Sequence, residues 1–177
     1  MLERLKLPTA IPVRDARIVI RRATRDDLHA LMRLLADDPI SAGRGDLALD
    51  SDEPAYAAAL DRILRDAGNE LVVATNANGA IVGTLQLTLI PGMARRGSTR
   101  LLIEAVRIAS TERGSGIGSA VMRWVIEHAA IDLEASLVQL TSDTAREDAH
   151  RFYTRLGFVG SHVGFKYDVA PSTHAVG

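Results

Sequence analysis

The sequence predicts an α+β fold, and three observations support that prediction. Alternating apolar and polar residues near the start predict an isolated strand, and two apolar runs around the Asn78-Gly79 dipeptide predict an antiparallel hairpin. A further apolar run, 99–109, enters a glycine-rich turn that opens an amphipathic helix, and the short apolar strand 135–142 follows. Antiparallel hairpins followed by a single βαβ unit are typical of α+β proteins rather than doubly wound sheets.

Length and composition exclude several classes of protein. The chain of 177 residues fits one domain with a substantial core. A net charge of −1 provides no electrostatic footprint for nucleic acid, and no apolar run approaches the ~18 residues of a membrane span. We therefore expect neither nucleic acid nor a membrane as a partner. Because the sequence has no cysteine, it has no disulfide, thiolate metal site or cysteine nucleophile, and a soluble cytoplasmic protein fits best.

The N-terminal residues differ from a signal peptide, because they are charged and carry Pro8 and Pro12 where an apolar core would stand. We interpret 1–15 as a loose lead-in, 16–169 as a single domain and 170–177 as a frayed tail.

The first half of the domain combines a strand with two helices. Residues 16–23 alternate and predict the first strand. Thr24, with Asp27 three residues on, forms a weak capping box for a helix that Pro39 stops. The remaining elements of this half are a loop over 39–51 and a second helix, capped by Ser51 or Asp52 and ended by Gly68.

The second half begins with the hairpin. Its strands are 70–75 and 80–90, and Gly83 inside the second strand indicates a bulge or a close backbone approach. The elements that follow are a turn over 91–98, a strand over 99–109 antiparallel to its predecessor, a helix after the glycine turn, a strand over 135–142 parallel to 99–109, a helix over 145–156 and a final strand over 158–169.

The glycine turn holds Gly114, Gly116 and Gly118 and predicts a pyrophosphate site. The first N–H groups of the following helix have no partner within it, and the helix dipole is positive at that end. A P-loop is excluded because no lysine follows these glycines. A dinucleotide fingerprint fits poorly because Ser119 stands where its third glycine would be.

Two motifs then identify a family. Arg113, Gly116 and Gly118 match the pattern [RQ]-x-x-G-x-[GA], and AHRFYTRLGF at 149–158 looks like A-x-x-F-Y-x-x-x-G-F. With both motifs in order, the chain resembles the GCN5-related N-acetyltransferase (GNAT) family from Arg17 to Val169. The resemblance implies a GNAT-type acyl-CoA N-acyltransferase fold, a central, mostly antiparallel sheet with one parallel splayed pair in the order β-α-α-β-β-β-α-β-α-β.

The resemblance also implies acetyl-CoA as co-substrate. Val106, Arg107 and Ile108 would pair with the pantetheine arm, and one freed N–H would stabilise the tetrahedral oxyanion. The alternative is that these residues are ordinary core strand. The backbone of the turn would hold the CoA pyrophosphate through Arg113, Gly114, Ser115, Gly116, Ile117, Gly118 and Ser119.

Glu104 and Tyr153 are the predicted catalytic residues. Attack on a thioester needs a neutral amine, so a base must take its proton. Glu104 lies within an apolar run, on the face of Leu102 and Val106 unless a bulge intervenes, and partial desolvation would raise its pKa. A salt bridge with Arg107 or a wet sheet edge is an equal alternative. Tyr153 occupies the position of the family's general-acid tyrosine, and core packing is its alternative.

We expect an N-acetyltransferase acting on a primary amine of a small metabolite by direct attack in a ternary complex. The alternatives are acetylation of protein N-termini or lysines, and a catalytically weak CoA-binding sensor or interaction module. The candidates for lining the acceptor site are Asp37, Asp38 and Arg44, and solvated loop charges are the alternative. The segment from Ser142 to Phe165 also resembles aminoalkylphosphonate acetyltransferases of this family, yet a lone histidine such as His162 gives no reason to expect a metal. Homodimers are frequent among such folds, and the oligomeric state is left open.

Overall fold

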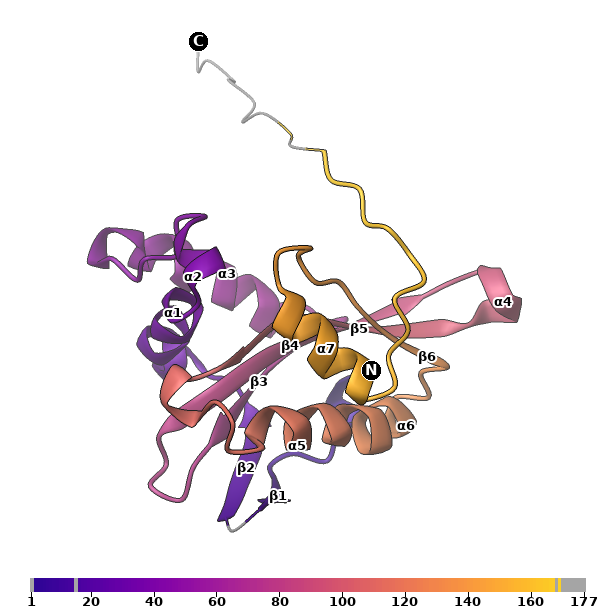
Figure 1. Cartoon of the computed structure of the whole chain (residues 1–177), viewed down its shortest axis with the longest axis horizontal. Coiled ribbons are helices and arrows are strands. Elements are labelled where there is room, and N and C mark those ends of the chain that lie inside the picture. The colour runs from indigo at the N-terminus through magenta and orange to yellow at the C-terminus, as the bar shows by residue number, and fades with distance from the viewer. Residues whose placement is uncertain (1, 15, 168, 170–177) are drawn as a thin grey trace. The chain divides into compact units, whose positions relative to one another are not determined.

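The computed structural model describes residues 2–14, 16–167 and 169. The chain forms two compact units, Met1–Leu140 and Thr141–Gly177, and each is described by itself. The first unit contains a sheet in the sequential order β1-β2-β3-β4-β5-β6, antiparallel throughout except for the parallel pair β5–β6 (Figure 1). The predicted mostly antiparallel sheet with one parallel pair is therefore confirmed. Its strands are β1 (Thr9–Val13), β2 (Ala16–Arg22), β3 (Asn69–Thr75), β4 (Ile81–Pro91), β5 (Thr99–Ile108) and β6 (Leu137–Leu140).

Three helices of the first unit, α1, α3 and α5, pack against the sheet, whereas α4 lies at the tip of the β4–β5 hairpin (Figure 1). Among the described residues, a single helix forms the regular structure of the second unit. A π-helical stretch, Val125–Ala129, joins α5 to α6. In the described part of the chain, no helix has the length and apolar character to cross a membrane. The helices are α1 (Leu28–Ala36), α2 (Pro39–Ala42), α3 (Glu53–Arg65), α4 (Ala94–Gly97), α5 (Ile117–Trp124), α6 (Ala130–Asp132) and, in the second unit, α7 (Glu147–Arg155).

Both faces of the sheet are buried. On one face, Leu71 and Val73 of β3 pack in a cluster with Leu31 of α1 and Leu60 of α3. Residues opposite one another in register share a face, so the second face is lined by the even-numbered residues of β3 and their neighbours. The fully buried strand residues of this second face include Ile20, Val72, Leu85, Leu87, Leu101 and Ile103.

Local signals account for most of the first helices. The predicted capping box is present, with the Thr24 amide donating to Asp27 Oδ2 at 2.8 Å. Arg21 donates to both carboxylate oxygens of Asp27, and this guanidinium holds the pKa of Asp27 below its usual range. A short turn at Arg25–Asp27 then leads into α1.

The loop predicted over 39–51 is wrong at its start, because residues 39–42 form α2. Asp38 caps this helix by accepting a hydrogen bond from the Ser41 amide at 2.8 Å, and Pro39 occupies the first turn, where it needs no hydrogen-bond donor. Asp38 is buried at this cap, and its role at the acceptor site stays a prediction.

The structure confirms the hairpin of β3 and β4, predicted from Asn78-Gly79, and the irregularity predicted at Gly83. Asn76 and Gly79 form the turn, and the register shifts where Ala74 faces Gly83 and Thr75 faces Ile81. A side chain at Gly83 would stand 2.7 Å from Ile108 Cδ1 and 3.1 Å from the Arg107 carbonyl oxygen. The close backbone approach expected there is therefore real, and it lies next to the end of β5.

The first residues are ordered into the sheet, which corrects the prediction of a loose lead-in. Leu2 and Leu5 are each 3% exposed, and Arg22 donates hydrogen bonds to both of their carbonyl oxygens. Strand β1 then pairs with β2 as the edge strand, and Pro12 is tolerated there because an edge strand needs donors on one side only. The boundary predicted at residue 16 cuts through this hairpin.

The predicted final strand is also wrong. Residues 158–167 and 169 form no strand, although apolar side chains alternate along them and are exposed: Val163, Phe165, Tyr167 and Val169. Alternation indicates a segment that fits a sheet, but a strand also requires a partner to pair with. The predicted tail, 170–177, lies outside the described residues.

Candidate active site

The candidate site is built around the second half of β5. The parallel pairing of β5 with β6 ends where Ile103 faces Leu140, but β5 continues for five more residues to Ile108. Within the described residues of the first unit, no strand pairs with 104–108 on the β6 side. This pattern fits the predicted splayed pair, because within the first unit the backbone of 104–108 has no strand partner on that side.

A bulge interrupts the other side of β5. Gln86 of β4 faces Glu104 and Thr84 faces Arg107, so two residues of β5 stand against the one residue between them. Ala105 at the bulge has a φ of 49°, which is unusual for a residue with a side chain. The bulge also breaks the alternation of the strand, since Glu104 and Ala105 are both exposed.

Of the two environments predicted for Glu104, the structure shows the exposed one. Its register partner Gln86 keeps Glu104 on the face of Leu102, as alternation predicts, but the side chain is exposed, just before the bulge. What remains is an acidic group beside the splay, within reach of solvent water.

The glycine turn follows β5 and ends at α5. Gly114 and Gly116 have φ values of 82° and 95°, which a residue with a side chain rarely adopts, and Gly116 is the N-cap of α5. Ser115 Oγ donates to the Glu112 carbonyl at 2.6 Å and tightens the turn. The amides of Gly118 and Ser119 precede any intrahelical acceptor, so this end of the helix offers donors to an anion.

The junction of α1 and α2 fastens the start of this turn. Asp37 accepts hydrogen bonds from the Ser110 amide, through Oδ2 at 2.5 Å, and from Arg113 Nη2, through its carbonyl at 2.9 Å. Arg107 Nη2 donates to Ser41 Oγ at 2.6 Å. The backbone donor of Ser110 is the largest cause that lowers the pKa of Asp37. Sequence reasoning missed this clamp, although the Asp38-Pro39 pair is itself a helix-start signal that orders the junction.

Tyr153 lies in the second unit, on α7. Its half-buried ring makes edge-to-face contacts with Phe152 and Phe158, at centroid distances of 5.2 and 5.8 Å. Packing of this kind fixes the ring, as both the catalytic and the core interpretation require. Because Glu104 and Tyr153 belong to different units, their meeting in one site stays a prediction.

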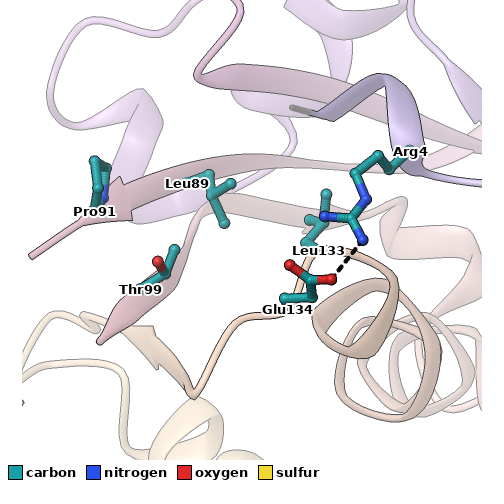
Figure 2. A pocket seen from close by; sticks show the side chains of 6 residues that line it. All are labelled: Arg4, Leu89, Pro91, Thr99, Leu133 and Glu134. Carbon is teal, nitrogen blue, oxygen red and sulfur yellow. Dashed lines mark hydrogen bonds and ion pairs between the residues drawn. The ribbon is translucent and has the colours of Figure 1, made fainter. Parts of the chain in front are cut away.

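One cavity of the first unit lies away from the candidate site. A cavity of about 160 Å³ lies at the opposite end of β5, where Arg4 and Glu134 form an ion pair at 2.8 Å (Figure 2). Its remaining lining residues are Leu89, Pro91, Thr99 and Leu133. Among the residues that the structure describes, no three His, Asp or Glu side chains gather as metal ligands.

With the splayed pair, the bulge and the glycine turn in place, the comparison with known proteins is clear. The chain belongs to the acetyltransferase (GNAT) family, whose model matches residues 28–158. The fold predicted from the sequence is therefore confirmed, and this family uses acetyl-CoA as co-substrate.

Three individual relatives illustrate the similarity, and two of them are named acetyltransferases. A transcriptional regulator from Bacillus halodurans C-125 is 42% identical, with a TM-score of 0.80 over 86% of this chain and 99% of that one. An acetyltransferase from Trypanosoma brucei is 25% identical, with a TM-score of 0.68 over 86% and 99%. The aminoalkylphosphonate N-acetyltransferase of Salmonella typhimurium is 34% identical over 88 residues. That match covers 50% of this chain and 56% of the relative, so the chain spans little more than half of the relative's length.

The Asp37 clamp leads to a prediction about stability and cofactor binding. In Asp37→Ala, loss of the hydrogen bond to the Ser110 amide lowers the free energy of unfolding at pH 7 by about 1 kcal/mol and raises the KM for acetyl-CoA. Because the pKa of Asp37 is lower in the folded state, its charged form stabilises the fold at pH values above the ordinary carboxyl pKa. This stabilisation is lost as the pH falls through the lowered pKa. The stability gap between wild type and Asp37→Ala therefore narrows on acidification.

Denaturant unfolding at pH 7 and pH 3 measures that gap, and Asp26→Ala, at an exposed carboxylate, is the matched control. A gap that stays constant over this range would show that the charge of Asp37 contributes nothing to the clamp.

Proposed function

We propose that this chain transfers the acetyl group of acetyl-CoA to a primary amine of a small metabolite. The observation that carries the proposal is the run of β5 past Ile103, where the strand leaves β6 and continues directly into the glycine turn. One continuous stretch thereby offers extended backbone for an amide-containing arm and helix N–H donors for a pyrophosphate. Acetyl-CoA carries both groups in that order.

The cofactor-binding residues follow from this placement. The backbone of Val106, Arg107 and Ile108 pairs with the pantetheine arm in place of a neighbouring strand. The turn holds the pyrophosphate through the backbone of Arg113, Gly114, Ser115, Gly116, Ile117, Gly118 and Ser119. The side chain of Arg113 supports this arrangement indirectly, because it donates to the Asp37 carbonyl and so fixes the turn.

The chemistry is a direct transfer. The amine nitrogen attacks the thioester carbonyl carbon, the new C–N bond forms, and the C–S bond breaks as the tetrahedral intermediate collapses. Glu104 takes the amine proton directly or through water, which suits its exposed position. Tyr153 protonates the departing CoA thiolate, and a backbone N–H beside the splay stabilises the oxyanion. With no cysteine in the sequence, no cysteine-bound acetyl intermediate forms.

A second candidate rests on one comparison. The protein from Bacillus halodurans described as a transcriptional regulator is 42% identical to this chain. A CoA-binding regulatory or interaction module is therefore the alternative to be tested, together with an acceptor that is a protein N-terminus or lysine. Turnover with small amines separates these functions.

The proposed general acid predicts the following kinetics. Thiol release from acetyl-CoA is measured with aminoalkylphosphonates, other small primary amines and peptides, the first because of the name of the Salmonella relative. Wild type turns over with a small amine. Tyr153→Phe lowers kcat about 100-fold while the KM for acetyl-CoA stays within twofold, because a general acid acts in the transition state.

Tyr167→Phe, at an exposed tyrosine, is the control and keeps full activity. Wild type that binds CoA but turns over no small amine would refute a small-metabolite transferase. Turnover with peptides alone would assign the acceptor to proteins. An unchanged kcat in Tyr153→Phe would assign that ring to packing.

The proposed base predicts a change in the pH profile. Glu104→Gln lowers kcat/KM for the amine and removes the acidic limb of the pH–rate profile, because the titrating carboxylate is gone. Glu127→Gln, which neutralises another exposed glutamate, leaves the profile intact. If the two variants give the same profile as wild type, the base is not Glu104.

A further inference from the structure

The turn between β1 and β2 lies against the glycine turn. A Cβ atom placed at Gly116 would be 3.6 Å from both Cγ and Nε of Arg14, and 3.6 Å from Cγ1 of Val13. Strand β1 also packs against α5, whose N-cap is Gly116. The stem of Arg14 therefore passes alongside the N-terminal end of α5.

The hairpin holds Arg14 in this place. Val13 and Ile11 are buried, and β1 pairs with β2 along its whole length, up to the pair Val13–Ala16. Ion pairs from Arg4 to Glu134 and from Lys6 to Asp132 attach the preceding residues to the far end of the α5–α6 segment. Arg14 itself is exposed, so its guanidinium stays hydrated and accessible to a ligand.

The motif's own arginine has another task. Arg113 uses Nη2 to hold the Asp37 carbonyl, which fixes the start of the turn. A cation beside the amides of α5 is thus supplied from outside the motif, by a residue that precedes the span matched by the family model, 28–158. The planar guanidinium of arginine suits phosphate oxygens, to which it can donate two parallel hydrogen bonds.

We propose that Arg14 is a phosphate-binding residue of the acetyl-CoA site and contacts the pyrophosphate held at the N-terminus of α5. This inference rests on the proposed function, because it takes CoA as the ligand of the glycine turn. Arg14 binds cofactor and takes no part in acetyl transfer. The N-terminal hairpin is then a wall of the cofactor site.

The test measures CoA binding by titration calorimetry and the KM for acetyl-CoA. Arg14→Gln weakens CoA binding about tenfold and raises the KM similarly, while kcat stays within twofold, since one charge-assisted contact is lost equally in ground and transition states. Arg14→Lys recovers part of the lost CoA affinity, because lysine keeps the positive charge but cannot donate two parallel hydrogen bonds. Arg17→Gln, an equal charge change at an exposed residue of the same hairpin, leaves both values unchanged.

Truncated ligands locate the contact. The loss in Arg14→Gln persists with 3′-dephospho-CoA, which keeps the pyrophosphate, and disappears with pantetheine, which has no phosphate. Equal CoA affinity of wild type and Arg14→Gln overturns the inference, and so does an Arg14→Gln effect that vanishes with 3′-dephospho-CoA. An equal weakening in Arg17→Gln also overturns it, since general charge would then be the cause. Wild type that fails to bind CoA refutes the proposed function instead, so the two failures are distinguishable.

Discussion

The site depends on the point where β5 and β6 stop pairing. Up to Ile103, β5 has strand partners on both sides, and beyond it, within the described residues of the first unit, it has a partner on the β4 side only. The bulge at Ala105 falls just past this point, and Ala105 is exposed although alternation would place it on the buried face of Leu101 and Ile103. A core strand thereby becomes a strand with one unpaired edge in the first unit within two residues, without a break in the chain.

The glycine turn that follows is held from two directions. The α1–α2 junction fastens its start through Asp37, and the β1–β2 hairpin lies against its end at Gly116. A turn with two left-handed glycines would be costly to order alone, because glycine loses more conformational freedom on folding than other residues. Contacts from both sides supply that order before a ligand arrives, which favours cofactor binding.

Sequence reasoning succeeded where a local signal determines local structure. Asn78-Gly79 predicted the hairpin, Thr24 with Asp27 predicted the capping box, and Gly83 marked a close backbone approach. It failed where the outcome depends on distant partners. Residues 2–13 are ordered because Leu2 and Leu5 are buried in the core and β1 pairs with β2. The alternating segment after residue 158, in contrast, pairs with no strand among the described residues. The bulge at Ala105 carries no glycine, so the sequence could not fix its position, although it allowed an exposed Glu104 as one of two alternatives.

The most direct test of the account is amide hydrogen exchange of the whole chain with and without CoA. Binding along β5 and the glycine turn predicts slower exchange over 104–119, together with the neighbouring turn that holds Arg14. The amides that line the cavity beside the Arg4–Glu134 ion pair, at the other end of β5, should exchange at the same rate with and without CoA. Protection that falls on that cavity and leaves 104–119 unchanged would contradict the account.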